Sequence, residues 1–457
     1  MDNRILDRID HTTFNLVGEA AASLSLPCYA VGGYVRDLFL CRSSKDIDFV
    51  SVGNGSGIAI ARETARRLGR HAHVAVFKTY GTAQVKAGGL ELEFVAARRE
   101  SYRSDSRNPE VEEGTLDDDL SRRDFTINAM ALSLNPGEMG LLIDRFGGLD
   151  DLRERVIRTP LDPDITFSDD PLRMMRAIRF ATQLDFTIYT LTLEAIARNA
   201  SRIKIITRER ILTELNKIML SPRPSIGWRL LDATGLLQYI LPELAAMKGV
   251  QIVKGRGHKD NFDHTLQVLD NVAAASDKLW LRWAALLHDI AKPATKHWDD
   301  AAGWTFHNHN FIGAKMVELH MRPIALVEET VTDSAVRRLI TDAGDDIDDL
   351  MLLCRADITS RNPQKVRTHL QNYQGVLEKI DAVNARDHLR QFQPPVDGQE
   401  IMDTFNLSPC ATVGLIKSAI KDAILDGLIP NDHAAAFDFM LTYAQTLGLS
   451  PASGPSH

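Results

Sequence analysis

Two aspartates on one predicted strand are the residues of this chain best suited to chemistry. The stretch from 29 to 50 reads YAVGGYVRDLFLCRSSKDIDFV, and Asp46 and Asp48 begin the strand pattern at its end. Residues two apart in a strand point to the same face, so the two carboxylates lie side by side. They repel each other unless a divalent cation lies between them. The pair predicts a metal site, although DxD alone also fits a solvated strand end.

A pair of glycines upstream of the aspartates predicts a phosphate-binding turn. Gly32 and Gly33 precede a short amphipathic helix that carries Arg36. Glycines let the backbone approach a ligand closely, and the N-terminus of a helix attracts phosphate. Such a turn beside a carboxylate pair predicts metal-assisted phosphoryl chemistry on a nucleoside triphosphate.

A third carboxylate is predicted on a neighbouring strand. Strand patterns cover residues 73–78, 82–86 and 90–97. Gly88-Gly89 predicts a hairpin between the last two. The final strand reads LELEFVAAR, so Glu91 and Glu93 share a face and either could lie beside the aspartates. The same spacing also fits side chains that face solvent.

The segment SRRDFTINAMAL, residues 121–132, predicts a helix that follows a polar loop at 102–120. The polar side of this helix would consist of Arg122, Arg123, Asp124 and Asn128. Such a face is usually only solvated. Beside a triphosphate site, however, the arginines would clamp phosphates, and the asparagine would donate to a sugar or a phosphate.

The stretch 167–186, FSDDPLRMMRAIRFATQLDF, predicts a helix that could read a base. Asp170 before a proline is a helix-start signal, so capping alone could explain this aspartate. Arg173, Arg176 and Arg179 recur every three residues and spread over one side of the helix. Asp170 can accept from an exocyclic amino group while Arg173 donates to a ring nitrogen, which selects CTP and ATP over GTP and UTP.

The second half of the sequence predicts only helices, and four of its residues form a second candidate metal site. His264 lies on an amphipathic pattern, His288 and Asp289 end an apolar helix, and Asp357 lies on a later segment. A lone helical histidine is more often a core residue, but two histidines with two aspartates suit Mn, Fe, Ni, Zn or Mg. His309 in FHNHNFIGA is a further possible ligand.

Composition favours a multidomain protein with reduced thiols. The 457 residues are 44% hydrophobic and carry a formal charge of -8, and the four cysteines are scattered. The scattered cysteines predict a cytoplasmic protein, and no apolar stretch is expected to span a membrane.

Basic residues gather between 173 and 223, which suits a salt-sensitive RNA contact. The helix pattern 207–219 offers Glu209 and Glu214 as partners for the arginines.

Six motifs, taken in order, resemble those of class II tRNA nucleotidyltransferases. These are the CCA-adding enzymes, which share their head with bacterial poly(A) polymerases in the DNA polymerase beta superfamily. The motifs are GGYVRD…DIDF, ELEFVAAR, SRRDFTINAMAL, DRFGGLDDL, DDPLRMMRAIRFA and RERILTELNKIM. They cover roughly residues 25 to 225.

The resemblance implies an α+β fold, with a small five-stranded mixed sheet in the head and an all-α neck, body and tail that grip the acceptor arm of tRNA. The implied domains are a nucleotidyltransferase head at 1–155, a base-recognising and RNA-binding neck at 156–225, an HD-containing body at 226–385, and a tail at 386–457 with a disordered end.

The resemblance also implies roles for single residues. Asp46 and Asp48 would hold two Mg²⁺ ions, with Glu93 as a supporting carboxylate. The phosphate cradle would consist of Gly32, Gly33 and Arg36. The sugar and triphosphate would be contacted by Arg123, Asp124 and Asn128. Base reading would fall to Asp170 and Arg173, and the other nucleotide-binding candidates are Arg176 and Arg179. One departure is Asp169, which stands where the family motif EDxxR has glutamate.

The segments around His264, LLHDIAKP and Asp357 resemble an HD phosphohydrolase domain, with His309 at its usual extra position. This implies a divalent metal of unspecified identity. It leaves open an activity that trims 2′,3′-cyclic or 3′-phosphate ends of RNA, or a site kept only for folding.

The sequence therefore favours CCA addition from CTP and ATP to tRNA, with no membrane partner and the oligomeric state left open. The alternatives are a poly(A) polymerase, an enzyme that adds only CC or only A, an HD phosphohydrolase with a regulatory nucleotide-binding head, and an RNA-binding protein with an inactive head. The intact carboxylate pair argues against the last two.

Overall fold

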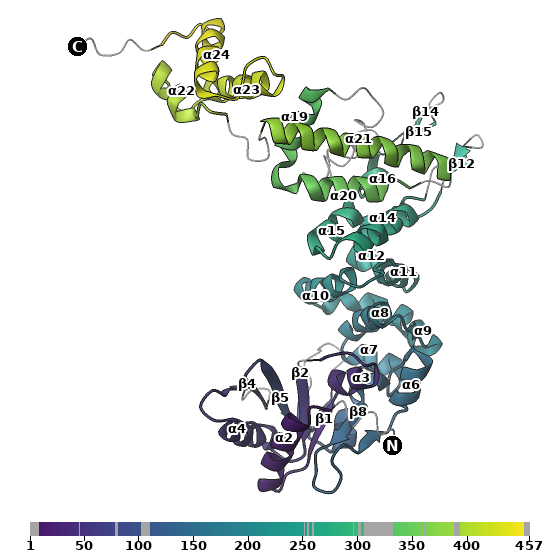
Figure 1. The fold of residues 1–457 in the computed structure, drawn as a ribbon. Coiled ribbons are helices and arrows are strands. Elements are labelled where there is room, and N and C mark those ends of the chain that lie inside the picture. The colour runs from purple at the N-terminus through teal and green to yellow at the C-terminus, as the bar shows by residue number, and fades with distance from the viewer. Residues whose placement is uncertain are drawn as a thin grey trace. The chain divides into compact units, whose positions relative to one another are not determined.

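The chain folds into two compact units, Met1–Ala245 and Ala246–His457, in the computed structural model (Figure 1). The residues that the structure describes are 9–44, 46–77, 81–101, 110–250, 252–253, 256–257, 260–295, 297–299, 303–305, 332–359, 362–387 and 394–451. The domain boundaries expected at 155, 225 and 385 stay predictions.

A mixed sheet forms the centre of the first unit, with the strand order β3-β4-β5-β2-β1-β8-β9. The strands are β1 (Cys28–Val31), β2 (Asp46–Ser51), β3 (His73–Phe77), β4 (Thr82–Ala87), β5 (Leu90–Ala96), β8 (Met130–Ser133) and β9 (Leu142–Asp144). β2 and β5 run parallel, and the other neighbours are antiparallel. The expected mixed-sheet head is confirmed, but within the described residues the sheet has seven strands rather than five.

The predicted hairpin between β4 and β5 is confirmed. Ala87 pairs with Leu90 across a two-residue turn. Gly88 and Gly89 have φ angles of 55° and 86°, which glycine adopts without steric cost. The turn fixes the register of β5, the strand that carries Glu91 and Glu93.

Helices α2 (His11–Ser23) and α4 (Ser56–Leu68) pack together beside β4 and β5. Gly57 allows α4 to approach the sheet, because a β-carbon there would lie 2.8 Å from the backbone carbon of Val95. The rings of Phe49 and Phe94 stack at 5.1 Å between centroids in the core that supports β2 and β5.

The helix predicted at 121–132 is wrong. Helix α5 (Leu116–Ser121) ends where it should begin, a 3-10 turn, η2, covers Thr126–Asn128, and β8 follows. All four residues of β8 are buried, because the strand lies between β1 and β9. A segment that is apolar on both faces shows no reliable period, so its helix-like spacing was misleading.

The loop predicted at 102–120 is also wrong in its second half. Strand β7 (Glu110–Glu113) pairs with β6 (Arg98–Ser101), and α5 begins after the cap residue Thr115. Residues 102–109 lie outside the described residues.

Helices complete the first unit. They are α3 (Gly33–Phe39) within the head, and then α6 (Gly148–Glu154), α7 (Pro163–Asp169), α8 (Leu172–Leu184), α9 (Thr190–Asn199), α10 (Arg208–Met219), α11 (Ser225–Ala233), α12 (Leu237–Ile240) and α13 (Pro242–Ala245). Helix α8 packs against α10 and α11, and α11 packs against α12 (Figure 1). A short parallel pair, β10 (Val156–Ile157) and β11 (Thr187–Ile188), ties the end of α8 to the chain that leaves the head.

The second unit is mostly helical, as predicted. Its described helices are α14 (Asn261–Ala275), α15 (Leu279–Leu287), α16 (Lys292–Thr295), α19 (Asp333–Ala343), α20 (Ile347–Asp357), α21 (Pro363–Asp387), α22 (Gly398–Phe405), α23 (Ala411–Leu425) and α24 (His433–Thr446). The expectation of helices alone is wrong, because β12 (Ile252–Val253) pairs with β13 (Arg256–Gly257), and β14 (His297–Asp299) with β15 (Gly303–Thr305). Among the described helices, none is long and apolar enough to cross a membrane.

Candidate active site

The parallel pairing of β2 and β5 brings the predicted carboxylates onto one face of the sheet. Asp48 lies directly opposite Glu93, and Asp46 lies opposite Glu91. Because side chains alternate along both strands, all four acids point to the same side. The residues that the sequence could only place on separate strands are therefore neighbours.

The surroundings of the two glutamates distinguish them. Lys86 Nζ forms an ion pair with Glu91 at 2.7 Å, so this carboxylate already has a cation beside it. Partial burial raises the pKa of Glu93, and the nearby Asp48 raises it further. Arg98 partly offsets these effects, and Glu93 remains the predicted third acid because it lies opposite Asp48.

Asp48 lies where negative charge is costly. Burial raises the pKa of Asp48, Arg123 lowers it, and Asp46 and Asp119 raise it again. Carboxylates that repel one another on an accessible sheet face are the oxygen donor set that a divalent cation prefers. The residues present therefore fit a metal.

The glycine turn lies directly beside Asp48. Gly32 has a φ of 75°, and a β-carbon there would lie 2.8 Å from Arg123 Nη1 and 3.5 Å from Asp48 Oδ2. A side chain at this position would fill the space between the carboxylate and the guanidinium. Gly32 is therefore required both for its backbone conformation and for this close approach.

A chain of polar contacts joins the head to helix α8. Arg36 Nη1 donates to Asn128 Oδ1 at 2.8 Å, and Asn128 Nδ2 donates to Asp124 Oδ1 at 2.9 Å. Arg176 Nε donates to Asp124 Oδ2 at 2.7 Å. Burial would raise the pKa of Asp124, but Arg176 and Asn128 outweigh it and lower the pKa to about 2.

Asp119 holds two of the arginines that face the site. It is fully buried and forms ion pairs with Arg122 and, at 3.0 Å, with Arg123. Burial raises the pKa of Asp119, but the two guanidiniums outweigh burial and lower it overall. The sequence assigned no role to Asp119.

The predicted base-reading pair lies at the start of α8. Helix α8 starts next to the predicted signal, but its N-cap is Pro171 and not Asp170, which ends α7. Asp170 Oδ1 accepts from the backbone N–H of Leu172 at 3.1 Å. Its other oxygen lies 3.8 Å from Arg210 Nη2. Arg173 Nη2 donates to the carbonyl oxygen of Arg122 at 2.7 Å, so the arginine is held beside the head.

These groups line one cavity of about 490 Å³ in the first unit. The sequence-predicted residues on its wall are Gly32, Gly33, Arg36, Asp48, Arg123, Asp124, Asn128, Asp170, Arg173, Arg176 and Arg179. The wall also contains Arg122, which the sequence offered as a phosphate clamp, and Leu172, Phe180 and Arg210, which the sequence did not place in the site. A volume of this size suits a nucleotide.

The missed residues have different explanations. Arg210 belongs to the basic region between 173 and 223, and its position there could have suggested a cationic wall. Phe180 is an apolar residue on an amphipathic helix, and nothing in its spacing separates it from the core. The predicted pairing of Glu214 is confirmed, because Glu214 Oε2 lies 2.6 Å from Arg179 Nε.

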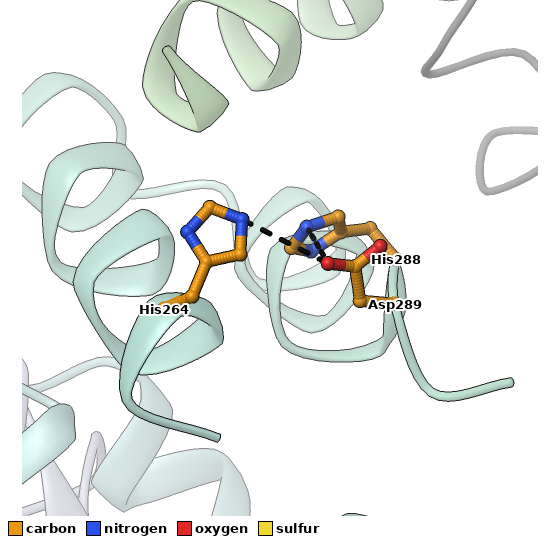
Figure 2. Close-up of side chains that lie close together, drawn as sticks. All are labelled: His264, His288 and Asp289. Atoms are coloured by element: carbon orange, nitrogen blue, oxygen red, sulfur yellow. Dashed lines mark ion pairs between the residues drawn. The ribbon is translucent and has the colours of Figure 1, made fainter. Parts of the chain in front are cut away.

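The second unit contains the other predicted donor cluster. Figure 2 shows that His264 points from α14 toward His288 and Asp289 at the end of α15. His264 Nε2 lies 2.8 Å from Asp357 Oδ1 and 3.7 Å from Asp289 Oδ2. His288 Nε2 lies 3.2 Å from Asp289 Oδ2 and 3.7 Å from Asp357 Oδ1.

Neighbouring groups hold these donors in place. His288 Nδ1 contacts the carbonyl oxygen of Ala285 at 2.7 Å. This contact leaves Nε2 as the nitrogen that can bind a metal in the cluster. Burial opposes charge on Asp289, but His288 and Lys292 hold its pKa well below the usual range. Donor atoms about 3 Å apart are the spacing that ligands of one ion show. The four residues therefore fit a metal, and His309 lies outside the described residues.

A parallel strand pair with acids on one face, beside a cavity lined by guanidiniums, is an arrangement that suits a nucleotidyltransferase. Residues 28–158 match the family described as "Poly A polymerase head domain", and residues 185–248 match "Probable RNA and SrmB- binding site of polymerase A". Residues 261–362 match "HD domain".

Relatives agree with this assignment. The chain is 31% identical to the A-adding tRNA nucleotidyltransferase of Deinococcus radiodurans over 86% of this chain and 90% of that protein. It is 46% identical to the A-adding enzyme of Aquifex aeolicus, but over 42% of this chain and only 23% of that protein. It is 36% identical to the CCA-adding enzyme of Anoxybacillus flavithermus over 62% and 63% of the two chains. The chain belongs to the tRNA nucleotidyltransferase family.

Solved structures show the same fold. A CCA-adding enzyme in its apo form covers 97% of this chain and 96% of its own, with a TM-score of 0.65 at 24% identity. A tRNA nucleotidyltransferase complexed with a primer tRNA and an incoming ATP analog covers 79% of this chain and 99% of its own, with a TM-score of 0.55 at 28% identity.

The low pKa of Asp124 predicts a pH-dependent contribution to stability. An acid with a pKa lowered from 3.8 to about 2 stabilises the fold fully above its unfolded pKa. This contribution, about 2 kcal/mol, is lost as the pH falls from about 4 toward 2. The gap in thermal midpoint between the natural protein and Asp124→Asn, measured by calorimetry, should shrink over that range.

The matched control is Asp150→Asn, because Asp150 forms an exposed ion pair with Arg153. Solvent screens such a pair, so its substitution should change the midpoint little at any pH. A gap for Asp124→Asn that is independent of pH would contradict the assigned charge state.

Proposed function

We propose that this enzyme adds CCA to the 3′ end of tRNA from CTP and ATP. One observation carries the proposal: a single cavity is lined by Asp48, Arg36, Asp170 and Arg173, the residues predicted to bind metal, phosphate and base. The matches to tRNA nucleotidyltransferases support tRNA as the acceptor. The named activities of the relatives include A addition alone, which is the second candidate.

In this reaction the 3′-oxygen of the RNA forms a bond to the α-phosphorus of the incoming nucleotide. The bond from that phosphorus to the bridging oxygen breaks, pyrophosphate leaves, and the hydroxyl proton is lost to solvent. Asp46 and Asp48, supported by Glu93, would hold Mg²⁺, which lowers the pKa of the attacking hydroxyl and neutralises charge on the triphosphate.

The arginines of the cavity would bind the negatively charged phosphates of the nucleotide, which the carboxylates repel. Arg36 and Arg123 lie beside the glycine turn, where the triphosphate would contact the backbone at Gly32 and Gly33. Asn128 would contact the sugar or a phosphate, while Asp124 holds it and Arg176 in place. Fixed guanidiniums can stabilise the charge that develops on pyrophosphate.

Base choice would fall to Asp170 and Arg173. Asp170 Oδ2 would accept from the amino group of cytosine or adenine, and Arg173 would donate to the neighbouring ring nitrogen. Guanine and uracil present the reverse order of donor and acceptor. We infer that Asp169 changes little, because it replaces one acid of the motif by another and does not line the cavity.

A second activity is proposed for the HD cluster of His264, His288, Asp289 and Asp357. Their donor spacing supports a divalent metal of unspecified identity, and such a metal would supply an activated water at that site. The chemistry fits hydrolysis of 2′,3′-cyclic or 3′-phosphate ends of RNA. A cytoplasmic location is also proposed, supported by four free cysteines and by a tRNA substrate.

The proposed function is tested with two tRNA transcripts, one lacking the terminal trinucleotide and one ending in CC. CTP with ATP should extend the first by CCA, CTP alone should add CC, and UTP or GTP should not be used. Sequencing gels measure each product. A long A tail would indicate a poly(A) polymerase, and extension of only the CC-ended transcript would indicate A addition alone.

Asp170→Ala and Arg173→Ala should lose discrimination against UTP and GTP.

The two glutamates of β5 provide a matched pair of variants. Glu93→Gln should slow nucleotide addition at least about tenfold, because it removes a ligand-supporting charge beside Asp48. Glu91→Gln should stay within about twofold, because Glu91 pairs with Lys86. Single-turnover extension at saturating tRNA measures both rates, and equal losses would show that the site does not distinguish the two acids.

The HD proposal predicts a loss of bound metal in His288→Ala. Elemental analysis of purified protein after dialysis against a divalent metal should show about one ion fewer than in the natural protein. His433→Ala is the control, since His433 contacts Glu400 on an exposed surface. Unchanged metal content in His288→Ala would reject the site, while metal binding without hydrolysis of phosphate-ended RNA would support a structural role.

A further inference from the structure

The ring of Phe180 lies among three guanidinium groups of the cavity. Its centroid is 3.9 Å from Cζ of Arg179, 5.0 Å from Cζ of Arg36 and 5.5 Å from Cζ of Arg176. Phe180 is 5% exposed and lines the cavity together with these arginines. A cation within about 6 Å of an aromatic centroid is attracted by the negative face of the ring. One apolar side chain therefore contacts three positive charges of the site.

Two of these arginines come from elements that are far apart in sequence. Arg36 belongs to α3 beside the glycine turn, whereas Arg176 belongs to the base-reading helix α8. The polar chain through Asn128 and Asp124 joins them on one side. The Phe180 ring joins them on the other, so five side chains form a closed loop between the two elements.

The positive charges around the Phe180 ring are balanced by carboxylates before any nucleotide binds. Arg36 donates to Asp37 at 2.9 Å, Arg176 donates to Asp124, and Arg179 pairs with Glu214. Each guanidinium therefore has one carboxylate, and the ring contributes an attraction that does not occupy a hydrogen-bond donor. Donors of the arginines remain available for phosphate oxygens.

We propose that Phe180 is a positioning residue of the nucleotide site. Its ring sets the distance between the phosphate-binding turn at α3 and the base-reading helix α8, so that one nucleoside triphosphate reaches both. This inference rests on the proposed nucleotide cavity. Because the ring has no hydrogen-bonding group, it acts equally on CTP and ATP and takes no part in base choice.

The test is direct binding of CTP and ATP, each with Mg²⁺, measured by calorimetry on the full chain. Phe180→Leu keeps an apolar side chain but removes the ring, and it should weaken binding of both nucleotides by about tenfold. The preference for CTP and ATP over UTP and GTP should not change. In extension assays the KM for nucleotide should rise by the same factor, while kcat stays within about twofold. Phe180→Tyr keeps the ring and should bind nearly as well as the natural protein.

Two further variants separate positioning from folding. Phe405→Leu makes the same change at a residue that is 6% exposed in the core of α22–α24, and it should lower the thermal midpoint without altering nucleotide binding. If Phe180→Leu does not fold, 3,4,5-trifluorophenylalanine at position 180 keeps the shape of the ring and weakens its negative face. Nucleotide binding should still weaken in that protein.

The outcomes are distinct. A Phe180→Leu protein with lower stability and unchanged affinity would overturn the proposal, as would equal losses in Phe180→Leu and Phe180→Tyr, or unchanged affinity after fluorination. If the natural protein binds both nucleotides but does not extend tRNA, the proposed function fails, and the affinities still decide the role of Phe180.

Discussion

The parallel pairing of β2 with β5 is the constraint on which the first unit depends. It places Asp48 opposite Glu93, whereas an antiparallel pairing or a shift by one residue would separate these acids or turn them to opposite faces. The stacked rings of Phe49 and Phe94 and the close packing of Gly57 against β5 hold that register. Core packing of ordinary apolar residues thus decides where the charged residues meet.

The acids gathered on one face of the sheet require positive charge in the rest of the cavity. Asp48 raises the pKa of Glu93, Asp46 raises that of Asp48, and nearby arginines supply the opposing charge. The arginines in turn require carboxylates of their own, which are Asp119, Asp124 and Glu214. The result is a site in which both signs of charge are held at fixed positions by buried partners, as electrostatic stabilisation of a transition state requires.

The two candidate sites differ in how the fold assembles them. In the first unit, a sheet carries the acids and a helix from a later segment closes the cavity. In the second unit, the ends of three helices bring each of two histidines within 2.8–3.7 Å of two aspartates. Asn271 Nδ2 donates to the carbonyl oxygen of Ala356 at 2.9 Å, so a side chain of α14 fixes the helix that ends in Asp357.

The sequence by itself determined the chemistry of each site, because residue types and short spacings are local. Short spacings within one strand, turn or helix were enough to find three pairs of residues. These pairs are Asp46 with Asp48, Gly32 with Gly33, and Asp170 with Arg173. The β4–β5 hairpin was equally predictable, since positive φ at Gly88 and Gly89 is a property of single residues.

Tertiary structure decided what depends on non-local pairing. Residues 130–133 form a buried strand rather than a helix, because β1 and β9 cover their two edges. Glu93 differs from Glu91 because Glu93 lies opposite Asp48, while Lys86 on the adjacent strand pairs with Glu91. Phe180 becomes part of the site only because α3 brings Arg36 to its ring. β1 and Arg36 lie far from their partners in the sequence, whereas Lys86 meets Glu91 across the β4–β5 hairpin. Periodicity within one segment contains neither kind of contact.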